Sequence, residues 1–203
     1  MRTGRFVAFE GGEGTGKSTQ ARLLAEHLGA VLTREPGGTA IGATVRSIVL
    51  AADDNGLVDR AEALLMAADR AQHVAEVVRP ALASGRDVVT DRYLGSSIAY
   101  QGFGRGLPVE EVRELSRWAT DGLMPDLVVL LEVDATEARA RIGHGRDRLE
   151  NAGVEFHRAV EDGFRTLAEA DPDRWVVVDG GGTVAEVAER VLAVASSRLG
   201  PVP

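Results

Sequence analysis

The sequence predicts an α/β fold in which a five-stranded parallel sheet carries helices on both faces. Short apolar segments alternate along the chain with longer segments of helical periodicity, as in βαβ units. The apolar segments are too short for helices, and several are rich in valine, as buried parallel strands are. Polar residues end three of them, at Glu10, Arg34 and Asp91, which places these side chains at the carboxyl edge where open α/β sheets bind ligands.

Each element is assigned in chain order from the same patterns. The expected strands are Phe6–Glu10, Val31–Arg34, Val88–Asp91, Leu127–Val133 and Trp175–Asp179. The expected helices are Lys17–Leu28, Ile41–Leu50, Arg60–Ala83, Val109–Asp121, Thr136–Arg141, Glu155–Ala170 and Val184–Leu199. Gly29 and Gly85 follow the first and third helices, where glycine commonly caps a helix.

Composition narrows the class of protein. The 203 residues suit one domain spanning residues 1–203, and 44% apolar residues provide a proper core. No apolar run approaches the roughly 18 residues of a membrane span. The net charge of −8 argues against attraction to a nucleic-acid backbone. The absence of cysteine excludes disulfides and thiolate sites, and a cytoplasmic setting is expected.

A phosphate-binding loop follows the first strand. The run Gly11-Gly12-Glu13-Gly14-Thr15-Gly16-Lys17-Ser18 matches G-x-x-x-x-G-K-[ST] between a strand and a helix. Glycines let successive N–H groups point at phosphate oxygens, and the helix N-terminus adds positive charge. Among 23 basic residues Lys17 is the one lysine, which we expect on the β- and γ-phosphates, with the Ser18 hydroxyl on Mg²⁺. The residues expected to bind ATP are Gly11, Gly12, Glu13, Gly14, Thr15, Gly16, Lys17, Ser18 and Thr19.

This motif does not by itself define the reaction, because GTPases, ATPases and kinases share it. A GTPase needs an N/T-K-x-D motif, and the only lysine already belongs to the loop. The chain is too short for the coupling domains of a motor or transport ATPase. Kinases of small molecules remain.

Three further segments indicate the acceptor. The run T-R-E-P-G-G-T covers residues 33–39, Asp91-Arg92-Tyr93 precedes S-S-I-A-Y-Q-G at residues 96–102, and one helix face carries Met66, Arg70 and His73. With these segments in this order, the chain resembles the thymidylate kinase family over nearly its whole length. The resemblance implies a P-loop nucleoside monophosphate kinase fold with a small lid, and transfer of a phosphoryl group from ATP, with Mg²⁺, to dTMP. The family is homodimeric, which implies a second copy of this chain as partner. The net charge and the short apolar runs predict neither nucleic acid nor a membrane as partner.

The resemblance also implies roles for single residues. Arg92 would hold the acceptor phosphate, and Asp91 would help to organise Mg²⁺ with Ser18. Arg70 and Ser97 would hydrogen-bond the thymine edge. Tyr100 would lie near the sugar and disfavour a 2′-hydroxyl, and Glu13 would lie near the 3′-hydroxyl. The expected dTMP-binding residues are Glu13, Glu35, Pro36, Met66, Arg70, Arg92, Ser97, Tyr100 and Gln101.

Structural explanations of the same residues remain open from the sequence. Arg92 and Asp91 could form an ion pair, Arg70 could be a solvated helix arginine, and Ser97 could cap a helix. Tyr100 could be a packing aromatic, and Met66, where the family usually has an aromatic, could be core. His73 is interpreted as scaffold.

The expected lid covers about residues 139–150. Arg139, Arg141, Arg146 and Arg148 flank Gly143-His144-Gly145, at spacings that do not share one helix face. Guanidinium groups stabilise the charge on a transferring phosphoryl group, so Arg141 and Arg148 are expected to be catalytic beside Lys17, Arg92 and Asp91. Two alternatives stay open: another nucleoside monophosphate or deoxynucleoside kinase, and a non-catalytic nucleotide-binding protein.

Overall fold

The expected parallel sheet is confirmed. The computed structural model describes residues 4–51, 56–141, 148–149 and 151–200. Its five strands lie in the order β2-β3-β1-β4-β5, and every neighbouring pair is parallel. The strands are β1 (Phe6–Glu10), β2 (Val31–Arg34), β3 (Val88–Asp91), β4 (Leu127–Glu132) and β5 (Trp175–Asp179). The expected bounds are right for four strands, and β4 ends one residue early.

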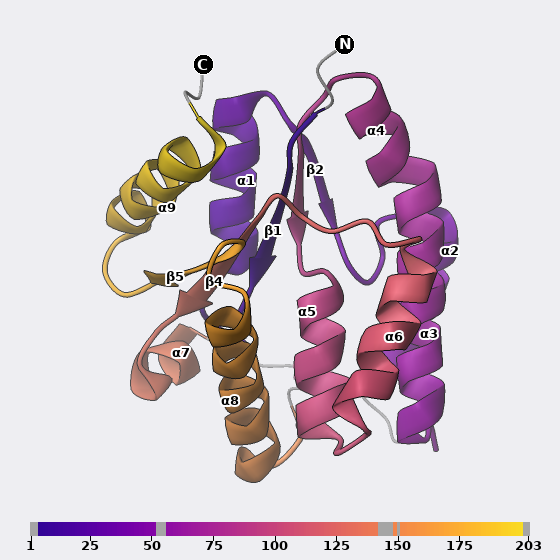
Figure 1. Ribbon diagram of the computed structural model, residues 1–203. Helices are drawn as coiled ribbons and strands as arrows, with labels where there is room; N and C mark the ends of the chain where they lie inside the picture. The colour runs from indigo at the N-terminus through magenta and orange to yellow at the C-terminus, as the bar shows by residue number, and fades with distance from the viewer. Residues whose placement is uncertain (1–3, 52–55, 142–147, 150, 201–203) are drawn as a thin grey trace.

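Helices cover both faces of the sheet (Figure 1). They are α1 (Lys17–Leu28), α2 (Ala40–Val49), α3 (Asp59–His73), α4 (Arg79–Ala83), α5 (Leu94–Ser97), α6 (Val109–Ala119), α7 (Ala135–Arg141), α8 (Val154–Ala170) and α9 (Val184–Leu199). Two π-helical segments, η1 (Val74–Val78) and η2 (Ile98–Gly104), continue α3 and α5.

Each face of the sheet is covered by its own apolar cluster. On one face α1 and α9 pack on the sheet, where Ala21, Leu24 and Val191 meet Phe9 and other strand residues. On the other face, residues of η1, η2 and α8 pack against alternate strand residues such as Phe6 and Ala8. This alternation along β1 is what a strand buried on both sides requires.

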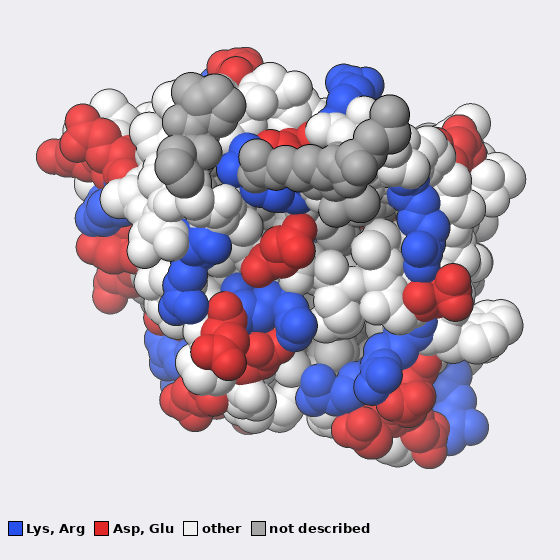
Figure 2. Space-filling view, turned by 45° about the horizontal axis from the view of Figure 1, so that its top comes forward, with Lys and Arg blue, Asp and Glu red and all other residues white. Residues whose placement is uncertain are grey.

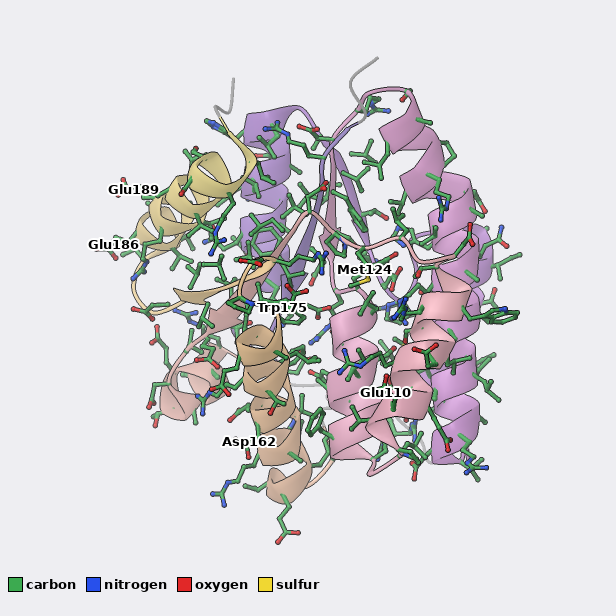
Figure 3. The ribbon with its side chains drawn as sticks, viewed as in Figure 1. Glu110, Met124, Asp162, Trp175, Glu186 and Glu189 are labelled. Carbon is green, nitrogen blue, oxygen red and sulfur yellow. The ribbon has the colours of Figure 1, made fainter. Side chains whose placement is uncertain are left out.

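The helix Leu94–Gly104 was not predicted. Its glycines disfavour a helix by propensity, but tertiary packing requires them. A Cβ on Gly95 would lie 2.7 Å from the ring of Trp175, which Figure 3 shows in the middle of the molecule, and one on Gly104 would lie 2.6 Å from Phe156. The predicted helix Arg60–Ala83 is continuous but wider at η1, because π-helical turns hold an extra residue.

The carboxyl edge of the sheet gathers the polar strand ends. Glu10 and Asp91 end neighbouring strands, and Arg34 pairs in register with Asp91. The P-loop and the segment 35–39 leave the same edge. Among the described residues, no helix is both long and apolar enough to cross a membrane.

Candidate active site

The P-loop has the backbone that its glycines predict. Gly11, Gly14 and Gly16 have φ angles of 141°, 75° and 91°, which side chains disfavour. A Cβ on Gly11 would lie 2.4 Å from the carbonyl oxygen of Leu131, and one on Gly14 would lie 2.4 Å from that of Ala138. The loop is therefore held between β4 and α7, with its backbone fixed at the start of α1.

Lys17 is buried at the centre of this loop. Its Nζ donates to the carbonyl oxygen of Gly12 at 2.5 Å and to Thr15 Oγ1 at 3.3 Å. Burial and the nearby Arg92 guanidinium lower its pKa to about 8, against the opposing effect of Glu13. The negative charge of a bound triphosphate would favour the charged form of this buried ammonium group.

Ser18 and Asp91 meet beside the loop. Ser18 Oγ donates to Asp91 Oδ2 at 2.5 Å, and Asp91 Oδ1 is buried without a partner among the described residues. A hydroxyl and a carboxylate are hard oxygen donors, and Mg²⁺ commonly takes one or two of these together with water and phosphate oxygens. These two residues therefore fit Mg²⁺.

Arg92 connects the P-loop to the acceptor side. Its φ of 71° is unusual for a residue with a side chain, and such conformations cluster at functional sites. Its guanidinium donates to the Gly11 carbonyl oxygen at 3.1 Å, to Ser96 Oγ at 3.0 Å and to Tyr100 Oη at 3.1 Å. Its ion-pair partner is Glu13 rather than the adjacent Asp91.

Glu13 completes this cluster. Tyr100 Oη donates to Glu13 Oε1 at 3.0 Å, beside the ion pair with Arg92. Burial favours the neutral carboxyl, but Arg92 and Lys17 outweigh it and lower the pKa of Glu13 to about 2. Tyr100 is thus both a packing aromatic, 5% exposed, and a hydrogen-bonded member of the site.

An elongated cavity runs from the P-loop over Arg92 towards α3. It brings together seven of the nine residues expected to bind dTMP. The lining residues are Glu13, Lys17, Ser18, Arg34, Glu35, Pro36, Arg46, Leu50, Met66, Asp91, Arg92, Ser96, Tyr100, Gln101 and Leu149. Met66 also packs against Val45 and Val49, so it is core and cavity wall at once.

Arg70 and Ser97 do not line that cavity. Arg70 is fully buried, and its guanidinium donates to Glu35 Oε2 at 2.7 Å, to Ser97 Oγ at 3.0 Å and to Ser116 Oγ at 3.3 Å. Arg70 is therefore not a solvated helix arginine. The expected contact of Arg70 and Ser97 with the thymine edge stays a prediction.

His73 extends this buried network. Its Nδ1 lies 2.7 Å from Glu35 Oε1, and its Nε2 lies 2.7 Å from Thr33 Oγ1. These bonds fit the interpretation of His73 as scaffold. Glu35 lines the cavity and also pairs with Arg70 and with His73, so it connects the cavity to this buried network.

The two arginines expected to be catalytic in the lid lie in different places. Arg141 lines a second cavity along the P-loop, with Gly14, Gly16 and Thr19, and donates to the Gly180 carbonyl oxygen at 3.1 Å. Arg141 also forms an ion pair with Glu137 on α7 at 2.5 Å. Arg148 does not line this cavity and pairs instead with buried Glu62 on α3. The side chain of Arg139, all of Arg146 and the Gly143–Gly145 segment lie outside the described residues.

Sequence reasoning missed several residues of the site. Arg34 and Glu10 were noted only as polar strand ends, and Arg46 and Glu62 had no distinguishing signal. Arg46 donates to the Pro36 carbonyl oxygen at 3.0 Å, next to the cis Glu35–Pro36 peptide bond.

Glu10 is a buried carboxyl behind Arg92. It accepts from the backbone N–H groups of Tyr93 and Ser96 at 3.1 and 3.0 Å, and from Ser96 Oγ. Burial raises the pKa of Glu10 to about 7, although the bond from Ser96 and the charge of Arg92 act the other way. Because Ser96 also accepts from Arg92, Glu10 supports the position of that guanidinium.

Comparisons with known proteins identify the family and the fold of this chain. The family model described as thymidylate kinase matches residues 9–191. A thymidylate kinase of Leifsonia xyli is 54% identical over 94% of this chain and 93% of its own length. One of Bifidobacterium longum is 50% identical over 91% of this chain and 94% of its own length. The crystal structure of thymidylate kinase from Ehrlichia chaffeensis has a TM-score of 0.80 and 31% identity, covering 95% of this chain and 98% of that one. The chain therefore belongs to the thymidylate kinase family.

Proposed function

We propose that the chain transfers the γ-phosphoryl group of ATP to the 5′-phosphate of dTMP, giving dTDP and ADP. The observation that carries this proposal is the position of Arg92. Its guanidinium bonds the P-loop at Gly11 and the acceptor cavity at Ser96 and Tyr100. A cation there neutralises charge on both the donor and the acceptor phosphates.

Each group at the donor end has one task. Lys17 and the P-loop N–H groups hold the β- and γ-phosphates. Ser18 and Asp91 would hold Mg²⁺, which would neutralise phosphate charge. Arg141 lines a cavity along the same loop, and we assign it as the lid cation on this ground. The attacking oxygen is already anionic, so the transfer needs neither a strong base nor a covalent enzyme intermediate.

The acceptor end holds dTMP between side chains from distant parts of the chain. Arg92 binds its phosphate, with Arg34 lining the same cavity. Tyr100 and Glu13 lie at the sugar, where the phenol ring leaves less room for a 2′-hydroxyl. Met66, Pro36 and Gln101 line the part of the cavity assigned to the base. Arg70 and Ser97 are assigned to hydrogen-bond the thymine edge, and Glu35, which lines the cavity, holds the Arg70 guanidinium.

An ADP-release assay with ATP and Mg²⁺ tests this function. We expect turnover with dTMP to exceed that with dUMP, CMP, AMP and thymidine. A different preferred monophosphate would keep the kinase chemistry and remove the thymine pocket. ATP binding without turnover on any acceptor would instead favour a non-catalytic nucleotide-binding protein.

We also propose a homodimer built on the outer face of α2, α3 and α6, which lie side by side (Figure 1). Each of these helices exposes a large apolar side chain, namely Ile41 and Ile48, Leu64, and Trp118. Trp118 is 82% exposed, and a second copy of the chain would bury it together with the other apolar side chains of these helices. Sedimentation velocity would distinguish a dimer from a monomer.

The remaining proposals concern nucleic-acid partners, domain organisation and location in the cell. On the face in Figure 2, acidic and basic side chains are interspersed and no broad basic patch appears. This arrangement, with the net charge of −8, argues against nucleic acid as a partner. The single domain over residues 1–203, the lid at about 139–150 and the cytoplasmic setting stay predictions.

A further inference from the structure

Glu62 is a buried carboxylate that the phosphoryl transfer does not use. It lies in the first turn of α3, has no exposed surface and does not line the acceptor cavity. Three donors converge on it. Gln101 Nε2 donates to Glu62 Oε1 at 2.8 Å, Arg105 Nη2 donates to Oε2 at 3.1 Å, and Arg148 forms an ion pair with Oε2.

These contacts fix the orientation of the Gln101 amide. A glutamine amide has one donating and one accepting end, and a half-turn exchanges them. A carboxylate only accepts, so the NH₂ end must face Glu62, and the C=O end must face the other way. Arg105 and Arg148 also donate to this carboxyl group, because a guanidinium carries only donors.

The other end of this amide is unsatisfied. Gln101 lines the acceptor cavity and is 1% exposed, and its Oε1 is buried without a hydrogen-bond partner in the part of the chain that the structure describes. A buried acceptor without a partner is costly, and a substrate that donates to it regains that free energy. Thymine and uracil carry an N3–H donor, whereas N3 of cytosine carries a lone pair that would repel the oxygen.

We propose that Glu62 is a positioning residue for base selection: it locks the Gln101 amide with its oxygen available to the acceptor base, and so favours bases with an N3–H group over cytosine. This inference rests on the proposed function, since the base must occupy the cavity that Gln101 lines. Glu62 acts through Gln101 and touches no substrate.

The first experiment compares Glu62→Gln with wild type on dTMP, dUMP and dCMP at saturating ATP. A neutral amide at position 62 can donate or accept, so the Gln101 amide is free to turn. We expect the ratio of kcat/KM for dTMP to that for dCMP to fall about 10-fold, through KM rather than kcat. The ratio of dTMP to dUMP should not change, because both bases carry N3–H, and KM for ATP should not change.

Asp59→Asn is the matched control. Asp59 lies on the same helix and pairs with the same Arg105 at 3.5 Å, with 49% of its side chain exposed, and the structure gives it no bond to Gln101. This variant should leave all three ratios at their wild-type values. A dTMP-to-dCMP ratio that survives in folded Glu62→Gln, or falls equally in Asp59→Asn, would overturn the proposal.

A double-mutant cycle with Gln101→Met tests whether Glu62 acts through the Gln101 amide. If Glu62 acts through the amide, Gln101→Met alone lowers the dTMP-to-dCMP ratio, and adding Glu62→Gln lowers it no further. Equal effects of Glu62→Gln in both backgrounds would contradict this. Should Glu62→Gln fail to fold, full retention of the ratio in Gln101→Met would still overturn the proposal. Failure of the wild type to use dTMP would instead count against the proposed function.

Discussion

The donor end of the site is formed mainly by backbone, whereas the acceptor end is formed mainly by side chains. The P-loop is made of backbone, and its shape follows from eight consecutive residues with glycines at positive φ. The acceptor end is made of buried charged side chains that are far apart in sequence. Arg70 bonds Glu35 across 35 positions, and Arg148 bonds Glu62 across 86. The donor end therefore depends on local conformation, and the acceptor end depends on the tertiary fold.

The largest effects should come from the cations that join the two ends. We expect Lys17→Ala and Arg92→Ala each to lower kcat/KM on the order of 10³-fold, because each removes charge stabilisation in a water-poor site. In steady-state kinetics, Arg92→Ala should raise KM for dTMP far more than KM for ATP. Arg22→Ala is the control, since Arg22 forms an exposed pair with Glu26. A loss below tenfold for Lys17→Ala would contradict the assignment of the donor end.

The acceptor end should be more sensitive in stability. Glu35→Gln leaves the buried Arg70 without its ionic partner and weakens the contact with His73. Breaking a fully buried pair costs about 3–5 kcal/mol of unfolding free energy. Urea denaturation measures this cost.

Glu26→Gln is the control for that measurement. Both members of the Arg22–Glu26 pair are at least half exposed, and such pairs contribute about 0–1 kcal/mol. Equal losses in the two variants would mean that the buried network does not hold the acceptor end.

The donor end should respond to pH. The pKa of Lys17 is lowered to about 8 by burial and Arg92, and ATP binding needs the charged form. The charged form persists below that pKa and is lost above it. We therefore expect kcat/KM for ATP to fall about tenfold for each pH unit above about 8. At saturating ATP, the pH above which kcat falls should be higher, because bound phosphates favour the ammonium form of Lys17. A flat profile to pH 10 would contradict this.

The smallest effect on catalysis should come from the outer face, remote from both ends. Leu64 is 58% exposed on α3, so Leu64→Glu should convert the proposed dimer to monomer. We expect kcat to stay within about twofold, as for surface changes away from a site. Sedimentation velocity and kinetics on one sample give both values. An unchanged sedimentation coefficient would place the interface elsewhere.

The contrast between the two ends also explains what the sequence could predict. The strands and the P-loop could be found because their signals are local: valine-rich runs and a glycine pattern ending in the only lysine. The helix Leu94–Gly104 could not, because packing against Trp175 and Phe156 overrides the low propensity of its glycines. The partners of Arg70 and Arg148 could not be predicted either, since arginine supplies nearly all positive charges of this chain and the pairing needs the tertiary fold.

The most direct test of the account is the acceptor preference of the wild-type chain in a coupled ADP-release assay with ATP and Mg²⁺. We predict that kcat/KM for dTMP exceeds that for dUMP, CMP, AMP and thymidine, and that Arg92→Ala lowers kcat/KM for dTMP on the order of 10³-fold. Faster turnover with another monophosphate, or ATP binding with no turnover on any acceptor, would contradict it.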